Sequence, residues 1–385
     1  MKILIIRNYP SHIDVQFNTY NIQEIGLAKA LVRKGHKCDI VFWADKEEKT
    51  VDYIFDGDKH ITIFYRFGKN ILKNAIYNSI DDLICKYDVI QPCEYNQYQS
   101  WVLAKKYPGK TVIYHGPYFS DFNKRYNLMC QIFDAFFLKR YIKLDTKFMV
   151  KSSLAFSFLN KKGIFKRNIS TVGVGLDLGV LSKSEEGVIP TFISDIDEFK
   201  DEVKLLYIGR LEERRNIPYI YDVLKAVLDR GLSAVLIIVG KGDKKYIDKC
   251  NDYAERLGIT ERIHKIDKLE QKHLSRLYQK SDFFLLPTYY EIFGMVLLEA
   301  MYYKTLVITT LNGGSDVLIE NEKNGIVMDC DSQKCAEKII NLYENKGLYD
   351  SICMAAYALI KNDFTWDSLV GKFIKAYESL RKEDS

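Results

Sequence analysis

The sequence lacks several features that would place it in common classes of protein. No apolar run approaches the roughly 20 residues that a membrane-spanning helix needs, because Lys and Arg interrupt even the apolar stretch at residues 133–149. The opening segment, MKILIIRNYP, has neither the apolar length nor the small-residue cleavage site of a signal peptide and is typical of a first β-strand. We therefore expect a chain that is made and kept in the cytoplasm.

Metal-site and disulfide signatures are also missing. The eight cysteines include no C-x-x-C pair, and the closest two, Cys330 and Cys335, have no His beside them. We expect reduced cysteines that serve the packing. The sequence also has no solenoid repeat and no low-complexity tract.

Length and composition favour two domains. The chain has 385 residues, of which 47% are hydrophobic, and single cores stop growing beyond about 250 to 300 residues. Both halves alternate short β-rich runs with longer helical patterns, which indicates parallel sheets covered on both faces. The expected strands are KILII, KCDIVFW, HITIFY, DVIQP, KTVIYHG and KFMV in the first half, and VKLLYIG, AVLIIVG, RIHKI, DFFLLP, TLVITT and GIVMD in the second.

We therefore predict an α/β fold of two Rossmann-like, doubly wound domains. The first would span residues 1–180 and the second residues 203–363, with an acidic linker at 181–202. Residues 364–385 would form a terminal helix that packs toward the N-terminal domain. Because doubly wound domains bind ligands at the carboxyl ends of their strands, a cleft between the two is the first place to look for chemistry.

Two strand ends in the second half carry residues that suit an anion. VKLLYIG ends at Gly209, and Arg210 and Arg215 follow it. Two guanidiniums beside a glycine that permits close backbone approach suit a diphosphate. The alternative is a solvated loop in which these arginines pair with the neighbouring glutamates. The next strand ends at Gly240, where GKGD completes neither the G-x-G-x-x-G nor the P-loop fingerprint.

The stretch EIFGMVLLE places Glu291 and Glu299 at the two ends of an apolar run. A helix is expected from about Phe293, so Phe293, Gly294 and Met295 would offer backbone N–H groups to a phosphate. Glu299 would lie about 12 Å along the helix axis from the level of Glu291. That separation matches a nucleotide-sugar, which has a hydroxyl-rich group at each end and a diphosphate between them.

These motifs resemble those of retaining nucleotide-sugar glycosyltransferases, family 4 in particular, with an E-x7-E motif and the GT-B fold. The resemblance runs through residues 203–330 in YIGRLEERRN, LIIVGKGD, LPTYYEIFG and TLNGGSDVLIENEKNGIV, whereas the N-terminal half is similar only in outline. It implies two domains that face each other across a cleft. Ile292 stands where the family usually has Gly, and the loop at residues 8–18 lacks the family's glycine pair.

The resemblance also implies roles for the candidate residues. Glu291 would contact the donor sugar, and Glu299 would bind the ribose of the nucleotide. Arg210 and Arg215 would neutralise the diphosphate, helped by the backbone of residues 293–295. The donor would be a UDP- or GDP-type sugar, and no cofactor or metal would be needed.

Other residues of the sequence leave alternatives open. By the resemblance, His115 in YHGPY would lie near the acceptor and the reacting carbon, but it could equally be a structural histidine at a strand end. D-x-D sequences at 195–197 and 329–331 have a spacing that metal-dependent transferases of another fold use. We expect these to belong to the linker and to a turn instead.

Charge is distributed unevenly along the chain. Residues 1–180 carry 27 Lys and Arg against 17 Asp and Glu, and residues 181–385 carry 29 against 34, so net charges of +10 and −5 make up the overall +5. Residues 124–167 alone hold eleven Lys and Arg, and aromatic residues are interleaved with them. These are Phe133, Phe136, Phe137, Tyr141, Phe148, Phe156 and Phe158. The region suits an anionic membrane surface, with an anionic soluble acceptor or a merely solvated face as alternatives.

The sequence as a whole predicts a retaining glycosyltransferase, most simply a hexosyltransferase of cell-surface polysaccharide or glycolipid assembly. The acceptor would be a hydroxyl of a glycan, a lipid-linked molecule or a small molecule, reached in the cytoplasm or at the cytoplasmic face of a membrane. No nucleic-acid partner is expected, because no recognition motif accompanies the charge. The alternative is a GT-B-shaped protein that binds a sugar nucleotide or a partner without turnover.

Overall fold

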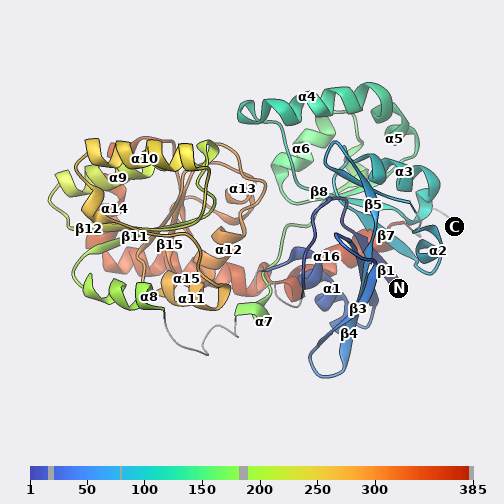
Figure 1. The fold of residues 1–385 in the computed structure, drawn as a ribbon, viewed down its shortest axis with the longest axis horizontal. Coiled ribbons are helices and arrows are strands. Elements are labelled where there is room, and N and C mark those ends of the chain that lie inside the picture. Colours follow the sequence, from blue (N-terminus) through green and yellow to red (C-terminus); the bar gives the residue numbers. More distant parts are fainter. Residues whose placement is uncertain (16–20, 79, 182–189, 381–385) are drawn as a thin grey trace. The chain divides into compact units, whose positions relative to one another are not determined.

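The computed structural model describes residues 1–15, 21–78, 80–181 and 190–380, which form two compact α/β units (Figure 1). The first unit comprises Met1–Gly175 and Thr365–Ser385, and the second comprises Leu176–Phe364. The units therefore divide at Gly175 rather than within the expected linker at 181–202. Part of that linker, residues 182–189, lies outside the described residues, and the rest is partly helical. Residues Thr191–Asp195 form a helix, because Ile193 and Ile196 are buried in the second unit.

The first unit is built on a mainly parallel sheet with the order β3-β4-β2-β1-β7, and β8, β9 and β10 continue the sheet. Parallel bridges from Ile90 to Thr111 and from Cys93 to Tyr114 join β7 to β8. The strand order reverses between β1 and β7. The strands of this unit are β1 (Lys2–Ile6), β2 (Lys37–Trp43), β3 (Lys49–Phe55), β4 (Lys59–Arg66), β5 (Gly68–Ile71), β6 (Asn74–Tyr77), β7 (Val89–Pro92), β8 (Val112–His115), β9 (Lys147–Val150) and β10 (Ile169–Thr171).

Helices flank the first sheet, and the last helix of the chain is one of them. Trp366 at the start of that helix leaves no room for a side chain at Gly26, where a Cβ atom would lie 2.2 Å from the indole nitrogen. Farther along, the Tyr377 hydroxyl donates to Gln91 in the sheet at 2.5 Å. The helices of this unit are α1 (Gln23–Arg33), α2 (Asp81–Ile84), α3 (Tyr98–Lys106), α4 (Lys124–Phe133), α5 (Lys139–Lys143), α6 (Ser153–Lys161) and α16 (Trp366–Glu378).

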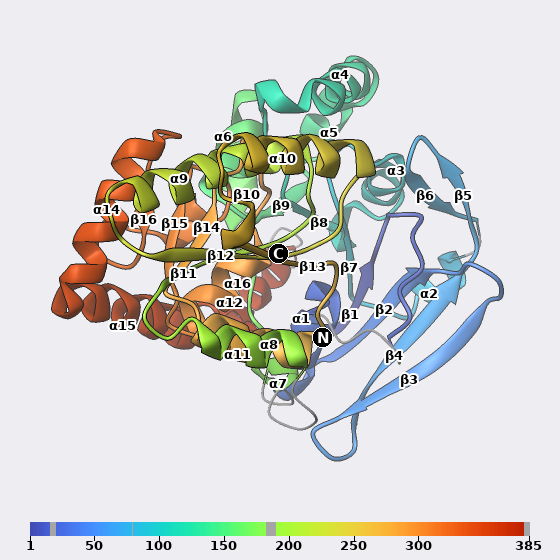
Figure 2. The same ribbon diagram turned by 60° about the vertical axis from the view of Figure 1, so that its left-hand side comes forward.

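The second unit is a parallel sheet with the order β13-β12-β11-β14-β15-β16. Its central strands are buried on both faces, which explains their almost continuous apolar sequences. Figure 2 shows α9 and α10 on one side of this sheet and α11 on the other. Its strands are β11 (Val203–Ile208), β12 (Ala234–Val239), β13 (Ile263–Ile266), β14 (Phe283–Leu286), β15 (Leu306–Thr309) and β16 (Ile326–Val327).

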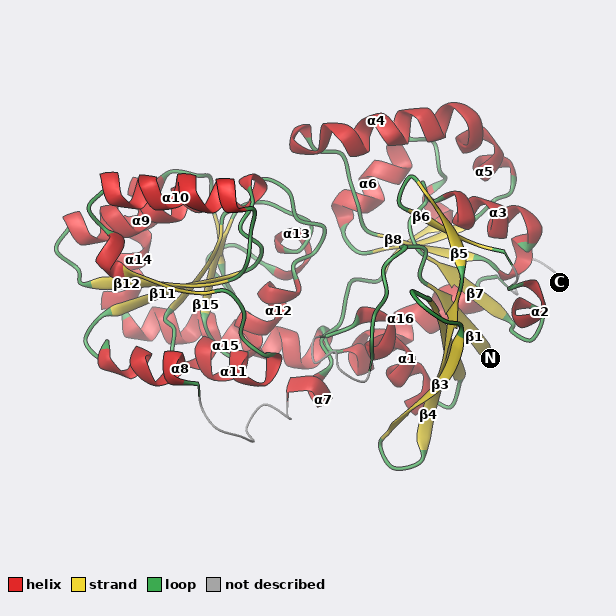
Figure 3. Ribbon diagram, viewed as in Figure 1, coloured by secondary structure: helices red, strands yellow, loops and turns green. Residues whose placement is uncertain are grey.

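From β11 to α14 the strands and helices of the second unit alternate as expected, while α7 and α8 precede β11 and α15 follows α14 (Figure 3). The helices are α7 (Leu178–Leu181), α8 (Thr191–Asp195), α9 (Ile217–Asp229), α10 (Lys244–Arg256), α11 (Gln271–Gln279), α12 (Met295–Tyr302), α13 (Ser315–Leu318), α14 (Ser332–Glu344) and α15 (Lys346–Asp363). In the described part of the chain, no helix is long and apolar enough to cross a bilayer.

The predicted strands are all present, but the first unit contains more than the sequence indicated. Strand β3 runs antiparallel to β4, and β5 and β6 form a separate antiparallel hairpin, so this unit is not purely parallel. Hairpin strands carry polar residues on their exposed face, and for this reason they lack the apolar run by which the buried parallel strands are recognised.

Candidate functional site

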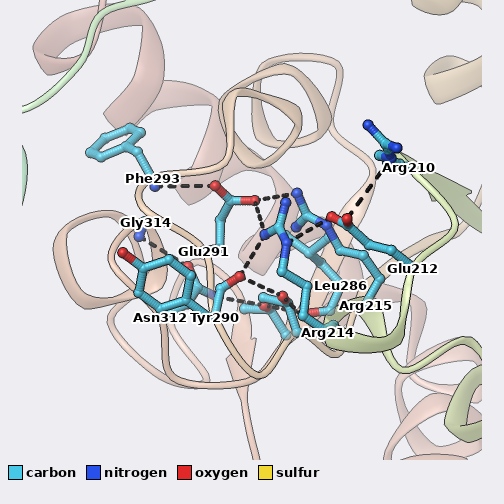
Figure 4. A network of polar contacts seen from close by, with 12 residues as sticks. Arg210, Glu212, Arg214, Arg215, Leu286, Tyr290, Glu291, Phe293, Asn312 and Gly314 are labelled. Carbon is cyan, nitrogen blue, oxygen red and sulfur yellow. Dashed lines mark hydrogen bonds and ion pairs between the residues drawn. The ribbon is translucent and has the colours of Figure 1, made fainter. Parts of the chain in front are cut away.

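Polar side chains of the second unit gather where its strand order reverses. β11 and β14 are neighbours, and the chain continues from β11 to one side of the sheet and from β14 to the other. In doubly wound sheets, ligands bind at such a point, outside the carboxyl ends of the strands. Residues 209–215 follow β11 and residues 287–294 follow β14, so the structure brings most of the predicted donor-site residues to this edge (Figure 4).

Glu291 is the centre of this cluster. Its Oε2 atom lies 2.5 Å from Nη2 of Arg215 and 3.7 Å from Nη1 of Arg214. The backbone N–H of Phe293 donates to its other oxygen at 3.4 Å. With 14% of its side chain exposed, Glu291 is oriented by two guanidiniums while it remains accessible.

Arg215 has hydrogen-bond donors without partners although its side chain is largely buried. Only 12% of its side chain is exposed, yet in the described residues its buried Nε and Nη1 atoms have no hydrogen-bond partner. Buried donors are nearly always paired, and an unpaired one costs about 1 to 3 kcal/mol. An anion with several oxygens, such as a phosphate, would satisfy them.

Arg214 is a member of the cluster that the sequence analysis did not single out. Its Nη1 donates to the backbone oxygen of Tyr290 at 2.7 Å, and its Nε lies 2.7 Å from Glu212. Its own backbone oxygen accepts from the N–H of Tyr289 at 2.9 Å. Arg214 thus ties the loop after β11 to the loop after β14. Its adjacency to Arg215 was the signal available in the sequence.

Arg210 lies apart from these contacts. Its side chain is 73% exposed, and its Nε atom is 3.9 Å from Glu212, which is the arrangement of a weak surface pair. Figure 4 shows Arg210 apart from the group around Glu291, with a dashed line to Glu212. Its backbone is fixed, because the Tyr207 hydroxyl donates to the Arg210 carbonyl at 2.8 Å. The solvated alternative therefore describes Arg210 in this structure, whereas Arg215 is engaged with Glu291.

Gly209 and Gly240 have a structural role that the sequence did not reveal. A Cβ atom at Gly240 would lie 1.8 Å from the carbonyl oxygen of Gly209. A hydrogen bond from Leu211 to Lys241 at 2.8 Å continues the pairing beyond the strand ends. These glycines let the two segments after β11 and β12 run in close contact. This contact fixes where the loop of residues 209–215, called the arginine loop below, begins.

A second pair of glycines, Gly313 and Gly314, packs against the loop that carries Glu291. These two residues were not among the predicted site residues. Gly313 donates to the Glu291 carbonyl at 3.0 Å. A Cβ atom at Gly313 would lie 2.1 Å from the carbonyl oxygen of Ile292, and one at Gly314 would lie 1.7 Å from that of Phe293. The loop after β15 therefore packs backbone to backbone against the loop that carries Glu291.

The helix after Glu291 begins later than predicted. Gly294 is the N-cap residue, with φ of 78° in the left-handed region, and α12 begins at Met295. Phe293 is buried and outside the helix. The expected separation of about 12 Å between Glu291 and Glu299 was reckoned with helical rise, whereas residues 291–294 precede the helix, so the separation stays a prediction.

Glu299 is the predicted residue that lies deepest. It is buried within α12, where its carboxylate accepts hydrogen bonds from Gln271 at 3.0 Å and from the Tyr278 hydroxyl at 3.1 Å. Burial of the Tyr278 hydroxyl, and after it the charge of Glu299, raises the pKa of Tyr278 well above the ordinary value. Glu299 therefore links α12 to α11.

The first unit holds a second polar cluster at its own switch point, between β1 and β7. His115, at the end of β8, is fully buried, and its Nδ1 lies 2.7 Å from Oε2 of Glu94, just after β7. Its Nε2 has no hydrogen-bond partner among the described residues. Glu94 also accepts from Gly116 at 3.1 Å and from the Tyr9 hydroxyl at 3.2 Å. His115 is thus fully buried and hydrogen-bonded to Glu94.

Glu94 was missed by the sequence analysis. It has a φ of 62°, a strained conformation for a residue with a side chain. Burial opposes its ionisation, but the hydrogen bond and charge of His115 and the charge of Lys151 outweigh burial, so its pKa lies below the ordinary value. Of the predicted N-terminal loop at 8–18, residues 16–18 lie outside the described residues.

No metal site emerges from the described side chains, because no group of three or more His, Cys, Asp or Glu is placed to hold an ion there. In the two D-x-D sequences, Asp197 pairs with Lys280, and Asp331 caps α14 by accepting from the backbone of Gln333 and Lys334 at 3.1 Å.

Parts of the chain resemble known families and proteins. Residues 188–358 match the family model described as glycosyl transferases group 1. An uncharacterised glycosyltransferase of Methanocaldococcus jannaschii is 28% identical over 179 residues, 46% of this chain and 45% of the relative. A glycogen synthase of Kosmotoga olearia is 25% identical over 252 residues, 62% of this chain and 51% of the relative. The chain thus spans about half the length of the curated relatives it matches.

Solved structures match over the whole chain. Sucrose-phosphate synthase of Thermosynechococcus elongatus has a TM-score of 0.72 at 16% identity, with 100% of both chains covered. The HepE protein of Anabaena, solved in complex with UDP, has a TM-score of 0.71 at 17% identity, with 98% of this chain and 100% of that chain covered. Such a likeness shows the fold. The chain has the GT-B glycosyltransferase fold, and its second unit matches the glycosyl transferases of group 1.

Proposed function

We propose that the protein is a retaining glycosyltransferase, most simply a hexosyltransferase, that moves a sugar from a UDP- or GDP-type sugar nucleotide to an acceptor hydroxyl. The acceptor would be a glycan, a lipid-linked molecule or a small molecule in cell-surface polysaccharide or glycolipid assembly. The observation that carries the proposal is Arg215, whose buried Nε and Nη1 lack partners beside an accessible Glu291. A diphosphate supplies oxygens for those donors, and Glu291 can accept from sugar hydroxyls.

The comparisons support a nucleotide-sugar donor. HepE of Anabaena was solved with UDP and with UDP-glucose, and the resemblance of Glu291 and Glu299 to an E-x7-E pair favours family 4. The match to the group 1 model covers the unit that contains this cluster.

In this proposal, catalysis is chiefly electrostatic. As the bond between the sugar and the diphosphate breaks, Arg215 and Arg210 stabilise the charge that grows on the leaving group, together with the N–H groups at the start of α12. Arg210 would turn toward the phosphates from its exposed position. The acceptor hydroxyl would attack an oxocarbenium-like sugar from the face that the diphosphate leaves. No divalent metal is required, because guanidiniums supply the positive charge.

Two residues would complete the arrangement. Glu299 would bind the ribose, after exchange of one of its hydrogen bonds with Gln271 or Tyr278. His115 would act near the acceptor, with Glu94 as the residue that positions its ring. The protein would work in the cytoplasm or on the cytoplasmic face of a membrane.

A thermal-shift screen against UDP, GDP, ADP and their common sugar conjugates, with and without EDTA, tests donor binding. A ligand present at a hundred times its Kd stabilises the folded state by about 2.7 kcal/mol. A shift confined to one base and unaffected by EDTA is expected. If no nucleotide raises the melting temperature, the proposed donor site is wrong.

A second candidate is a GT-B-shaped protein that binds a sugar nucleotide without turnover. The burial of His115 favours it, because a fully buried ring does not meet an acceptor without rearrangement. Release of UDP or GDP from the donor, followed with an added acceptor extract, separates the two. In an enzyme, Arg210→Ala would keep the thermal shift and abolish release. Donor binding without any release under all acceptor conditions would support the non-catalytic candidate.

A further inference from the structure

We propose that the first unit carries a docking face for the headgroup region of an anionic phospholipid bilayer. The face consists of the outer side of the helical run Lys124–Lys143 and the tip of the β5–β6 hairpin. The proposal does not depend on sugar transfer. The docking face lies in the first unit, whereas Arg214, Arg215 and Glu291 lie in the second.

The helical run exposes apolar side chains on one side. α4 continues through a π-helical segment, Asp134–Leu138, into α5. Leu128, Ile132 and Phe136 follow one another at intervals of four residues, and all are exposed, Phe136 at 66%. Residues at this spacing share a face of a helix. Single exposed apolar residues are common, but a row of them along one helix is not.

The structure changes which residues of the basic region could meet lipid. Of the aromatic residues expected there, most belong to the core of the unit. Buried or partly buried in that core are Phe133, Phe137, Tyr141, Phe148, Phe156 and Phe158. Phe136 is exposed, and the aliphatic Leu128 and Ile132 accompany it. The apolar part of the docking face is therefore a narrow row of side chains rather than an aromatic belt.

The hairpin tip has an unusual composition. Leu72 and Lys73 form the turn with φ of 51° and 65°, where two-residue turns favour Asn and Gly. A left-handed conformation costs a residue with a Cβ atom about 1 to 2 kcal/mol, and Leu72 is 72% exposed. Neither backbone preference nor burial explains a leucine here. A bilayer would cover the leucine and attract the lysine.

The two parts of the docking face are connected by contacts. The N–H of Tyr98 donates to the side-chain oxygen of Asn74, next to the hairpin turn, at 2.8 Å. The Tyr98 ring lies 5.9 Å from that of Phe137, and Phe137 neighbours Phe136. Figure 1 shows α4 along the outer edge of the first unit. The docking face therefore comprises both the row of apolar residues and the hairpin tip.

Positive charge surrounds these apolar residues. The exposed cations are Lys69, Lys73, Lys105, Lys124, Arg125, Lys139, Arg140 and Lys143. Within the run Lys124–Lys143 the only acid, Asp134, pairs with Lys162. Apolar residues flanked by cations at both ends of a helix are complementary to an anionic headgroup layer above an acyl region. An acidic protein partner would match the cations but not the leucine tip.

Co-sedimentation of the full chain with vesicles tests the docking face. Vesicles of phosphatidylcholine with 30% phosphatidylglycerol should pellet the protein at low salt, and those of pure phosphatidylcholine should not. Replacing Phe136 by Ser should lower partitioning about tenfold, and replacing Lys139 by Gln about fivefold, in line with about 1 kcal/mol per cation. Leu72→Ser should resemble Phe136→Ser.

A matched control comes from exposed apolar residues of the second unit. Leu348→Ser and Met354→Ser remove side chains that are also exposed, at 46% and 49%, and should leave partitioning unchanged. All variants should melt at the wild-type temperature, since each changes an exposed side chain. Failure of the wild type to pellet with anionic vesicles at low salt overturns the proposal. Concentration-dependent self-association without vesicle binding would also overturn it, in favour of a protein occupant.

Discussion

Each unit collects polar side chains where its strand order reverses, but the two clusters differ in exposure and in charge. In the second unit, Arg214, Arg215 and Glu291 are partly exposed, and Arg215 has donors without partners among the described residues. In the first unit, Glu94 and His115 are buried against each other at 2.7 Å. The same topological position thus supports an open charged cluster in one unit and a closed pair in the other.

The difference indicates a division of labour. The Arg215–Glu291 pair is largely buried, but the Nε and Nη1 atoms of Arg215 have no partner among the described residues, so an incoming phosphate can bind them while Glu291 stays in contact with Nη2. A buried pair is costly to separate, because each partner would be left without its hydrogen bond. We infer that the second cluster has donors left over to bind a charged ligand. The first is built to hold one histidine in one orientation.

The largest effect is expected from the open cluster. Arg215→Ala removes the guanidinium that contacts Glu291 and would face the diphosphate, so kcat should fall about a thousandfold, as when a catalytic oxyanion donor is removed. Steady-state kinetics and the thermal shift with the nucleotide measure the change. The shift should also shrink, because Arg215 would contact the phosphates in the ground state.

Arg214→Ala is the matched variant for that experiment. Arg214 holds the loops together through Tyr290 and Glu212, so its removal should lower the melting temperature more than Arg215→Ala does. Equal losses of activity and stability in both variants would contradict separate roles for these neighbours, and would place Arg215 among the structural residues.

A smaller effect is expected from the closed pair. In Glu94→Gln the hydrogen bond to Nδ1 can persist, but the carboxylate charge is lost and the tautomer of His115 is no longer fixed. A loss of about 10- to 100-fold in kcat is expected, by analogy with second partners of functional histidines. The pH profile of kcat should shift as well, which a purely structural role would not produce. Tyr9→Phe removes only the hydroxyl that donates to Oε1 of Glu94, the oxygen not bonded to His115, and should leave the pH profile of kcat unchanged.

The same variant makes a prediction for stability. The pKa of Glu94 is lowered in the folded state, so its ionised form stabilises the fold above the unfolded pKa, and this contribution is lost as the pH falls through the lowered folded pKa. Urea unfolding from pH 7 to below pH 4 should show that wild type loses stability below about pH 4.5. Glu94→Gln should lose less over that interval. Parallel curves would contradict the ionised pair.

The two clusters also differ in how far the sequence predicts them. Arg210, Arg215 and Glu291 stand in short segments directly after apolar strands, so their position at one sheet edge, and the contact between Arg215 and Glu291, follow from the parallel order of β11 and β14. Glu94 could not be found in this way. It follows the short strand β7 in a strained conformation, and nothing local in CEYNQ indicates that it pairs with a residue 21 positions later. Contacts between distant segments also fix the burial of Glu299, which α11 covers, and the role of the glycines after β15.

The smallest effect concerns those glycines, which support the open cluster without contact to a ligand. A Cβ atom at Gly313 would lie 2.1 Å from the carbonyl of Ile292, so Gly313→Ala should displace the loop that carries Glu291. Such overpacking costs about 1 to 3 kcal/mol in free energy of unfolding, and we expect about a tenfold weaker Kd for the nucleotide by titration calorimetry. Gly325→Ala is the control, because its Cβ would meet only side-chain carbons of Ile319 at 3.2 to 3.4 Å. If Gly313→Ala loses stability and keeps its affinity, the cluster tolerates displacement of Glu291, and the phosphate site rests on the arginine loop alone.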